Sequence, residues 1–199
     1  IIPVIKNRYL IYTFGLNIIC EKKEKKMLEK EYKFLVNEIP HSDNVVFIKQ
    51  YYFDTKKFLG VAIKWLNLDL KQAKGIDSIR LRQCVFENET TYFLTAKSKG
   101  DLCRREYETQ IPARFATNLL KFATKFIEKS RSILTIDNLK FEFDFYYKRK
   151  DKLKVCEVEV KKGDEYKKIL KILTQDLGLK VKDITFDSQY KNFNLAKEL

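Results

Sequence analysis

The sequence predicts an α+β protein in which an antiparallel sheet or barrel is combined with a few helices. Seven short segments alternate apolar and polar residues, the period of a β-strand, and most of the connections between them are short. Three other segments carry apolar residues at helical spacing. The chain has 199 residues, of which 45% are hydrophobic and 34% charged, so one folded domain with a sizeable core is expected.

The predicted strands are amphipathic and follow one another along most of the chain. Strands joined by short connections pair antiparallel, because a parallel crossover needs about a dozen residues or more. In chain order, the predicted strands cover residues 28–36, 45–54, 78–87, 90–99, 104–111, 139–147 and 153–161.

The predicted helices cover residues 56–73, 112–129 and 164–177. Pro112 suits the first turn of the second helix. An apolar stripe follows it at Phe115, Leu119, Phe122 and Phe126. Gly178 is a suitable C-terminal stop for the third helix. Apolar stripes of this kind are typical of core packing, so we assign them no ligand.

Residues 1–26 are predicted to be an extension of the folded domain, which then covers residues 27–199. Residues 10–20 form an apolar run that is too short to span a bilayer and lacks a small-residue cleavage site. The single methionine, Met27, stands directly before the first predicted strand. We expect the extension to be dispensable or an artefact of the chosen start, with a peripheral anchor as the alternative.

The chain is strongly basic, with a formal net charge of +13 and a sequence pI of about 9.4. This charge predicts an anionic partner: nucleic acid, an acidic membrane or a polyphosphate. The four cysteines show no CxxC or Cys/His spacing, and His41 is the only histidine. Zinc sites, disulfide frameworks and His-dependent nucleophilic catalysis are therefore disfavoured, and reduced thiols in a cytoplasmic protein are expected.

Charged residues recur at every second position of the predicted strands, so each strand presents them on one face. Like charges are segregated by strand, in the pairs Glu29/Glu31, Arg80/Arg82, Lys97/Lys99, Glu106/Glu108, Glu142/Asp144 and Glu157/Glu159. One interpretation is a sheet with one solvated face. The other is the inner wall of a barrel, where acidic pairs attract Mg²⁺ or Mn²⁺ and basic pairs attract phosphate oxygens, because packed like charges need counter-ions.

The order and spacing of these residues resemble the CYTH family, the triphosphate tunnel metalloenzymes. The opening ExExK pattern is Glu29, Glu31 and Lys33. Further motifs are an IxQxYxxT-like pattern at 48–55, RxR at 80–82, TxKxK at 95–99, RxExE at 104–108, KxR at 129–131, an ExDxF-like pattern at 142–146 and ExE at 157–159. The closing motif resembles residues 184–196, with Gln189 and Lys191 in place of the usual Arg and Ser. The segment between residues 55 and 80 is longer than is usual in the family.

The resemblance implies an eight-stranded antiparallel closed β-barrel, a tunnel, with helices packed outside. The residues that resemble the metal-binding set are Glu29, Glu31, Asp144, Glu157 and Glu159. The residues that resemble the triphosphate-binding set are Lys33, Arg80, Arg82, Lys97, Lys99, Arg104, Lys129 and Arg131. For Glu106, Glu108 and Glu142, salt bridges to the tunnel cations are an equal alternative to a role in binding.

The function implied is metal-dependent hydrolysis of a triphosphate, in the first place inorganic tripolyphosphate, with Mg²⁺ or Mn²⁺ as cofactor. Glu29, Glu31, Lys33 and Glu159 are the expected catalytic residues. A class IV-type adenylate cyclase and a thiamine triphosphatase are alternatives within the family. A non-catalytic protein that binds polyphosphate or nucleic acid is the alternative of another class. No membrane partner is expected, and the sequence does not predict the oligomeric state.

Overall fold

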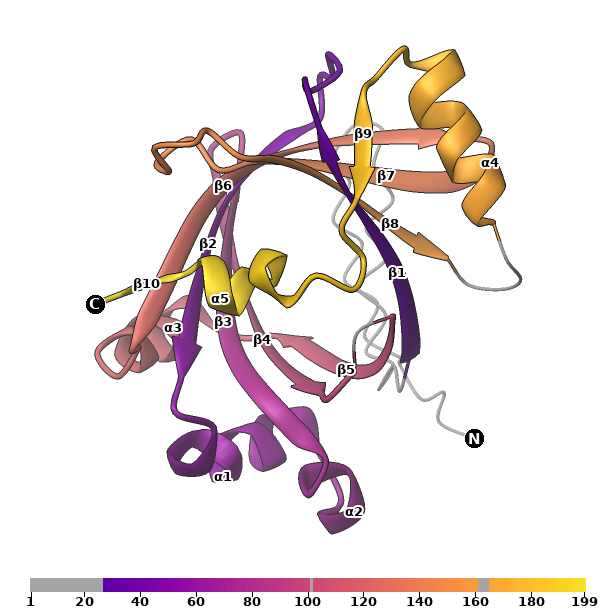
Figure 1. Cartoon of the computed structure of the whole chain (residues 1–199). Helices are drawn as coiled ribbons and strands as arrows, with labels where there is room; N and C mark the ends of the chain where they lie inside the picture. The colour runs from indigo at the N-terminus through magenta and orange to yellow at the C-terminus, as the bar shows by residue number, and fades with distance from the viewer. Residues whose placement is uncertain (1–26, 101, 161–164) are drawn as a thin grey trace, which may run out of the picture.

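Eight antiparallel strands close into a barrel in the computed structural model, which describes residues 27–100, 102–160 and 165–199 (Figure 1). The predicted extension over residues 1–26 lies outside the described residues. The barrel order is β6-β2-β3-β4-β5-β1-β8-β7, and the pairing of β7 with β6 closes it. The strands are β1 (Met27–Val36), β2 (Val45–Phe53), β3 (Ile76–Phe86), β4 (Glu89–Ser98), β5 (Cys103–Gln110), β6 (Lys125–Ile136), β7 (Leu139–Phe145) and β8 (Lys154–Val160). The predicted fold class and closed eight-stranded barrel are confirmed.

Strand β6 is the one barrel strand that periodicity alone missed. The helix predicted over residues 112–129 is wrong beyond its first half, because α3 covers only Ala113–Leu120 and β6 begins at Lys125. Phe122 does not belong to an apolar stripe, since 60% of its surface is exposed. The inward positions of β6 carry Lys129 and Arg131, and the positions between and beside them are Glu128, Ser130 and Ser132, so neither face of this stretch is apolar and the sequence shows no alternation there.

The other two predicted helices exist but are divided. Residues 56–73 form α1 (Thr55–Leu66) and α2 (Leu70–Ala73). They separate at Asn67, a left-handed C-cap with φ 50°, and Asp69 caps α2 by accepting a hydrogen bond from the amide of Gln72. The third prediction corresponds to α4 (Tyr166–Lys171), which continues as a π-helical turn (Ile172–Asp176). Gly178 follows with φ +66°, as its predicted role as a stop requires.

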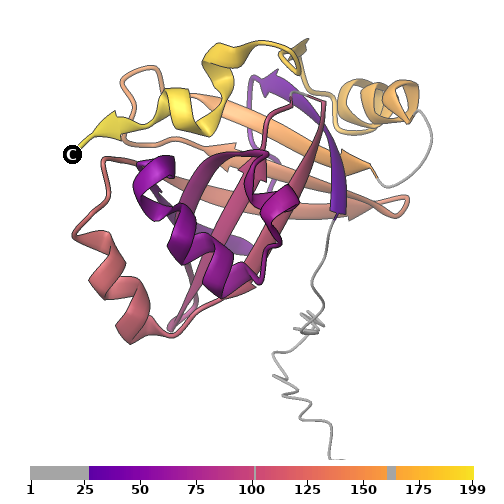
Figure 2. The same cartoon turned by 90° about the horizontal axis from the view of Figure 1, so that it is seen from below.

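The helices cover two separate parts of the outer barrel surface (Figure 2). Helices α1 and α3 pack over β3, β4 and β5, with Ala62, Leu66 and Leu119 in one core cluster. Helix α4 packs over β1, β7 and β8, with Ile169 buried against a second cluster. The apolar faces of the strands therefore point outward beneath helices, and their charged faces are left to point inward. None of the helices among the described residues is long and apolar enough to cross a membrane.

A third apolar cluster lies where the C-terminal segment, residues 184–199, crosses one end of the barrel (Figures 1 and 2). Ile184 and Leu195 of this segment pack against Tyr52, Tyr146 and other residues from the strands of the barrel. The segment contains a 3₁₀ turn (Ser188–Tyr190), α5 (Asn192–Leu195) and the short β10 (Lys197–Glu198), which pairs with β6. Another short strand, β9 (Val181–Asp183), pairs with β1 just before it.

Candidate active site

The strand register places the charged residues of neighbouring strands side by side on the inside of the barrel. Lys33 of β1 lies opposite Glu157 of β8, and Glu157 lies opposite Glu142 of β7. Arg131 and Glu157 are each only 7% exposed. These two side chains therefore do not belong to a solvated outer face but to the inner wall of the barrel, and the metal and phosphate predicted for that wall stay predictions.

A buried set of ion pairs, here the inner network, joins β1, β6, β7 and β8. Its centre is Arg131, whose Nε and Nη2 donate to the two oxygens of Asp144 at 2.6 and 2.7 Å. Nη2 of Arg131 also donates to Glu157 at 2.7 Å. The inner network consists of Lys33, Lys129, Arg131, Glu142, Asp144 and Glu157. Lys129 and Asp144 pair with each other and are both 0% exposed.

The protonation properties of the inner network follow from the balance of burial and pairing. Burial opposes ionisation of Glu142, but Arg131 and Lys140 outweigh it and lower the pKa of Glu142 to about 2. Burial likewise opposes ionisation of Glu157, yet Lys33, Lys129 and Arg131 hold its pKa well below the ordinary value. For Lys129, burial dominates and Arg131 adds to it, so its pKa is lowered.

A second set, here the wall network, joins β3, β4 and β5. Nη2 of Arg80 lies 3.3 Å from Glu106, and Lys97 forms an ion pair with the same carboxylate. Arg82 pairs in the same way with Glu108, which also accepts a hydrogen bond of 2.6 Å from Thr95. The like-charged pair of one strand is thus neutralised by the oppositely charged pair of another strand. Glu106, Glu108 and Glu142 all form salt bridges to cations of the barrel interior, which is one of the two roles predicted for them.

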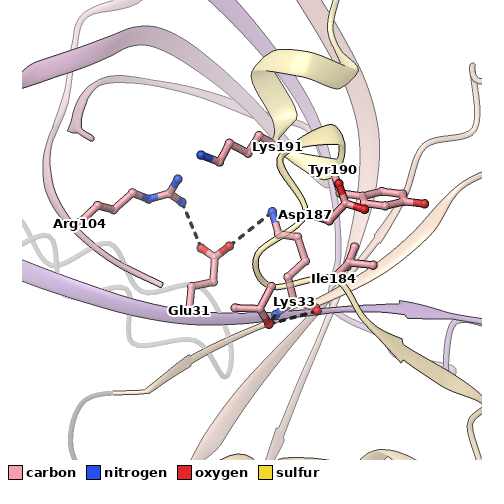
Figure 3. A pocket seen from close by; sticks show the side chains of 8 residues that line it. Glu31, Lys33, Arg104, Ile184, Asp187, Tyr190 and Lys191 are labelled. Atoms are coloured by element: carbon pink, nitrogen blue, oxygen red, sulfur yellow. Dashed lines mark hydrogen bonds and ion pairs between the residues drawn. The ribbon is translucent and has the colours of Figure 1, made fainter. Parts of the chain in front are cut away.

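A pocket, here the β1 pocket, adjoins the inner network, with which it shares Lys33 (Figure 3). It is lined by Glu31, Lys33, Arg104, Ile184, Thr185, Asp187, Tyr190 and Lys191. The carboxylate of Glu31 is 3.4 Å from Arg104 and 3.5 Å from Lys33. These separations exceed those of ordinary charge-assisted hydrogen bonds, so Glu31 is held more loosely than the carboxylates of the inner network.

Backbone contacts fix the C-terminal segment against β1 at the β1 pocket. The amide of Lys33 donates to Oγ1 of Thr185 at 3.1 Å, and the amide of Ile184 donates to the carbonyl of Lys33 at 2.9 Å. Asp187 caps the following turn by accepting from the amide of Gln189 at 3.0 Å. The pocket therefore has one wall from the barrel and one from the chain terminus.

The structure brings most predicted site residues together, with three differences. Lys99 follows the end of β4 and is exposed, whereas Lys97 is 7% exposed inside the barrel. Glu159 is exposed at the end of β8, although its backbone lies opposite Glu31. The backbone of Glu29 pairs with that of Arg104, but the side chain of Glu29 lies outside the described part.

Sequence reasoning did not assign the pocket residues of the C-terminal segment. The closing motif pointed to this stretch, and Lys191 was noted there only as a departure from the usual pattern. Gln189, the other departure, is exposed and does not line the pocket.

The donors near Glu31 suit a hard divalent cation. Within the described residues, no group of three or more His, Cys, Asp or Glu side chains is arranged to hold a metal ion. Mg²⁺, however, is commonly bound by one or two carboxylates together with water and phosphate oxygens. Glu31, loosely paired and adjacent in register to Glu159, offers such a donor set. Asp144 and Glu157 do not, because cations already occupy their oxygens.

The charged interior of a closed antiparallel barrel, with a pocket at the C-terminal segment, defines the architecture of this candidate site. No family model and no curated protein matches the chain. The structure is similar to that of the inorganic triphosphatase NE1496, with 27% identity and a TM-score of 0.53 over 85% of this chain and 94% of that one.

Two other solved structures share the fold. HpAC1 from Hippeastrum, an adenylyl cyclase candidate with a dominant triphosphatase activity, is 13% identical with a TM-score of 0.53 over 78% of this chain and 90% of that one. An adenylate cyclase candidate from Vibrio parahaemolyticus is 18% identical with a TM-score of 0.50 over 78% of this chain and 91% of that one. The chain therefore has the CYTH, or triphosphate tunnel, fold that its motifs predict.

Proposed function

We propose that this protein hydrolyses the terminal phosphoanhydride of a triphosphate, with inorganic tripolyphosphate as the first substrate, and that Mg²⁺ or Mn²⁺ is required. The observation that supports this most is the β1 pocket, where Glu31, loosely paired with Lys33 and Arg104, borders the ion-paired barrel interior. The likeness to NE1496, an inorganic triphosphatase, points to the same class of reaction.

The cations of the pocket and the wall network would bind the phosphate chain. Lys33, Arg104, Arg80, Arg82 and Lys97 are the side chains that we assign to this role. In the structure these cations pair with carboxylates. A bound phosphate chain would take the place of those carboxylates, so each cation would keep an anionic oxygen as its partner. Lys129 and Arg131 lie deeper, and we assign them to positioning Glu157 and Lys33 rather than to direct contact.

Glu31 and Glu159, together with Glu29, would hold the divalent cation. When bound, the cation supplies charge neutralisation and polarisation of the scissile phosphoanhydride. Asp144 and Glu157 keep the cations Lys129, Arg131 and Lys33 in place. The predicted metal-binding set is thereby divided into two groups. Glu29, Glu31 and Glu159 would be metal ligands, and the buried Asp144 and Glu157 would position cationic side chains.

Hydrolysis also needs a water molecule oriented in line with the leaving group. Glu31 or Glu159 would accept a hydrogen bond from this water and take its proton as the new P–O bond forms. The bond between the terminal phosphorus and the bridging oxygen breaks, and the electron pair leaves with the shortened phosphate chain. Lys33, whose pKa Glu157 and Glu31 raise against the opposing effect of burial, stays charged and stabilises the developing negative charge.

A panel of substrates tests the reaction and its specificity. Tripolyphosphate, thiamine triphosphate, ATP and GTP are each incubated with Mg²⁺ or Mn²⁺, and orthophosphate and cyclic AMP are measured. We expect metal-dependent orthophosphate release from tripolyphosphate. Cyclic AMP from ATP without orthophosphate would instead favour the cyclase, and the thiamine ester as the best substrate would favour the thiamine triphosphatase.

Substitutions at the two proposed ligands test the site. We expect Glu31→Gln and Glu159→Gln to lower kcat about 100-fold or more, with circular dichroism unchanged. Glu38→Gln, at an exposed glutamate after β1, is the matched control and should retain full activity. Arg82→Ala should raise KM more than it lowers kcat if its contact is equally strong in the ground and transition states.

Wild-type turnover in both glutamate variants would rule out this assignment. Duplex binding that weakens steeply with salt, without any metal-dependent phosphate release, would favour the non-catalytic nucleic-acid binder instead.

A further inference from the structure

The outer side of β2, β6 and the end of β7 carries aromatic side chains that no helix of the described residues covers. In Figure 1, α1 and α4 lie on other sides of the barrel from β6. Phe47, Phe126, Phe145 and Tyr147 belong to none of the three apolar clusters of the described residues. Phe47 is 53% exposed and Tyr147 is 36% exposed. Exposed aromatic side chains gathered on one part of a sheet indicate a binding surface.

Strand register arranges these rings in two rows across the sheet. In the first row, Phe47 of β2 and Phe145 of β7 lie on either side of Ser130 of β6. In the second row, Tyr51 of β2 lies beside Phe126 of β6, and the two rings stack with their centroids 6.3 Å apart. We call this surface the aromatic face, which consists of Phe47, Lys49, Tyr51, Phe126, Phe145 and Tyr147.

Lysine side chains occupy the space between the two rows. Lys49 and Lys148 each lie 2.9 Å from the carboxylate of Glu128, whose side chain is only 6% exposed. The hydrogen bond from Lys49 to Glu128 raises the pKa of Lys49, and Tyr51 and Tyr147, which lie close to this lysine, add to the rise. Two cations thus share one carboxylate, so the middle of the aromatic face is positively charged.

The loop that follows the aromatic face adds further positive charge. Residues 148–152 read Lys-Arg-Lys-Asp-Lys. Arg149 donates to both oxygens of Asp151, at 3.0 and 2.9 Å, so this pair is neutral. Lys150 and Lys152 are exposed. The loop therefore presents a net positive charge at the edge of the aromatic rows.

A hollow between the start of β6 and the C-terminal segment combines the two properties. Its apolar lining includes Phe126 and Leu195, and its cations are Lys148, Arg149 and Lys197. Lys197 of β10 pairs in register with Phe126, which places this lysine at the end of the second aromatic row. A ligand that carries both flat rings and negative charges fits such a lining.

We propose that the aromatic face and the loop at 148–152 bind single-stranded nucleic acid on the outside of the barrel, an inference that goes beyond the proposed function and does not depend on it. Bases stack on exposed aromatic rings, and the phosphate backbone is bound by the cations beside them. The aromatic face, the loop and Lys197 together carry six cations against the two carboxylates of Glu128 and Asp151. This charge is complementary to a phosphate backbone.

Other occupants fit the aromatic face less well. A second copy of the chain would place its own cations against these, at a cost in repulsion. An acidic membrane would take up the rings only by also burying the Lys49 and Glu128 pair that lies between the rows. A nucleic-acid duplex would present its phosphates but keep its bases stacked inside, so the rings would gain no partner.

Fluorescence anisotropy with a labelled oligothymidylate of about 12 nucleotides tests the proposal on the full chain at several sodium chloride concentrations. Phe47→Ala and Tyr147→Ala each remove one exposed ring, and Lys148→Gln removes one charge. Phe186→Ala, at a ring that is 70% exposed outside the aromatic face, and Lys182→Gln, at an exposed lysine of β9, are the matched controls. Circular dichroism and the melting temperature verify that each variant is folded.

We expect each of the two ring substitutions to weaken binding of the oligonucleotide about tenfold, the effect of losing one stacked base. Lys148→Gln should reduce the slope of log K against log salt by about 0.7, the value for one phosphate contact on a single strand. Phe186→Ala should bind within about twofold of the wild type, and Lys182→Gln should keep the wild-type slope. A duplex of the same length should bind about tenfold more weakly than the single strand at equal salt.

Tripolyphosphate with Mg²⁺, added at constant ionic strength, distinguishes the outer surface from the barrel interior. We expect it not to displace the oligonucleotide. Displacement, an equal loss of affinity in the control variants, or no binding by the wild type would each overturn the proposal. Binding to phosphatidylserine vesicles that depends on Phe47 and Tyr147, without binding of the oligonucleotide, would assign the aromatic face to an acidic membrane instead. A dimer that Phe47→Ala dissociates, again without oligonucleotide binding, would assign it to a second copy of the chain.

Discussion

Asp144 shows how the barrel tolerates charge in its interior. Its two oxygens accept from both Lys129 and Arg131, and all of its surface is buried. A buried carboxylate of this kind cannot be removed cheaply, because its loss leaves cations in a low-dielectric environment without their counter-charge.

We therefore expect Asp144→Asn to lower the free energy of unfolding by about 3–5 kcal/mol, measured by urea denaturation. Asp151→Asn is the matched control, since Asp151 forms an exposed pair with Arg149 at 2.9 Å. Loss of that surface pair should change stability by roughly 0–1 kcal/mol. Equal effects of the two substitutions would contradict the view that the inner network is structurally essential.

The lowered pKa of Glu142 predicts how the stability of the fold depends on pH. Its pKa falls from the ordinary 4.5 to about 2 on folding, because Arg131 and Lys140 outweigh the effect of burial. A carboxylate with a lowered pKa contributes stability that is fully present above about pH 4.5 and is lost as the pH falls toward 2. We expect the melting temperature of the wild type to fall more steeply over this range than that of Glu142→Gln, which has no proton to gain there. Parallel curves for the two proteins would show that Glu142 is not preferentially ionised in the folded state.

Alternation alone predicted which charges share a face, but not which of them pair. Glu31, Lys33, Arg80 and Arg82 could be placed on one face of their strands from spacing. The partner of each depends on register and barrel closure, which bring Arg82 of β3 to Glu108 of β5 across an intervening strand. The counter-ions expected to relieve the like-charged pairs are, in the structure, the opposite pairs of the protein itself.

Among the elements, β6 marks the limit of periodicity as a guide. Its inner face carries Lys129 and Arg131 and its outer face carries Glu128, Ser130 and Ser132, so over this stretch it lacks the one apolar face that the other barrel strands keep. Phe115, Leu119, Phe122 and Phe126 happen to fall at helical spacing across the boundary between α3 and β6. Only the KxR motif, through the resemblance to a known family, assigned an interior role to residues of this strand.

The C-terminal segment is the second element that required the structure, because short turns and a four-residue helix give no periodic signal. Its attachment is testable at Tyr146. We expect Tyr146→Phe, which removes the hydrogen bond to Asn192, to lower the free energy of unfolding by about 1 kcal/mol. Amide hydrogen exchange over residues 188–195 should become faster, since this bond helps to hold α5 against the barrel.

Tyr166→Phe is the matched control for that prediction. It also removes a tyrosine hydroxyl, the donor to Asp183 at 2.7 Å, but on α4 and β9 rather than on the C-terminal segment. Exchange over residues 188–195 should stay at the wild-type rate. Faster exchange in both variants would mean that the whole fold, and not the attachment of α5, controls opening.

At the scale of the whole molecule, most of the net positive charge does not come from the residues that line the tunnel. The two networks and the β1 pocket place seven cations and six carboxylates of the described barrel strands in the interior, so that the interior nearly balances. Most of the net charge of +13 must then lie elsewhere on the chain. The high pI, which first suggested a polyanionic partner, therefore supports nucleic-acid binding on the outer surface as much as triphosphate binding inside.

Ligand-induced stabilisation by tripolyphosphate tests the second of these possibilities, because a ligand of the tunnel contacts several barrel strands at once. At 100 times its dissociation constant, a ligand that binds only the folded state stabilises it by about 2.7 kcal/mol. For a chain of this size, we expect tripolyphosphate with Mg²⁺ to raise the melting temperature by about 5–10 °C in a scanning calorimetry experiment. Sodium chloride at the same ionic strength controls for screening of the surface charge, and Arg82→Ala, which lacks one wall cation, should show a smaller shift. A shift no larger than that given by sodium chloride would mean that tripolyphosphate does not enter the barrel, and the charged interior would then serve stability alone.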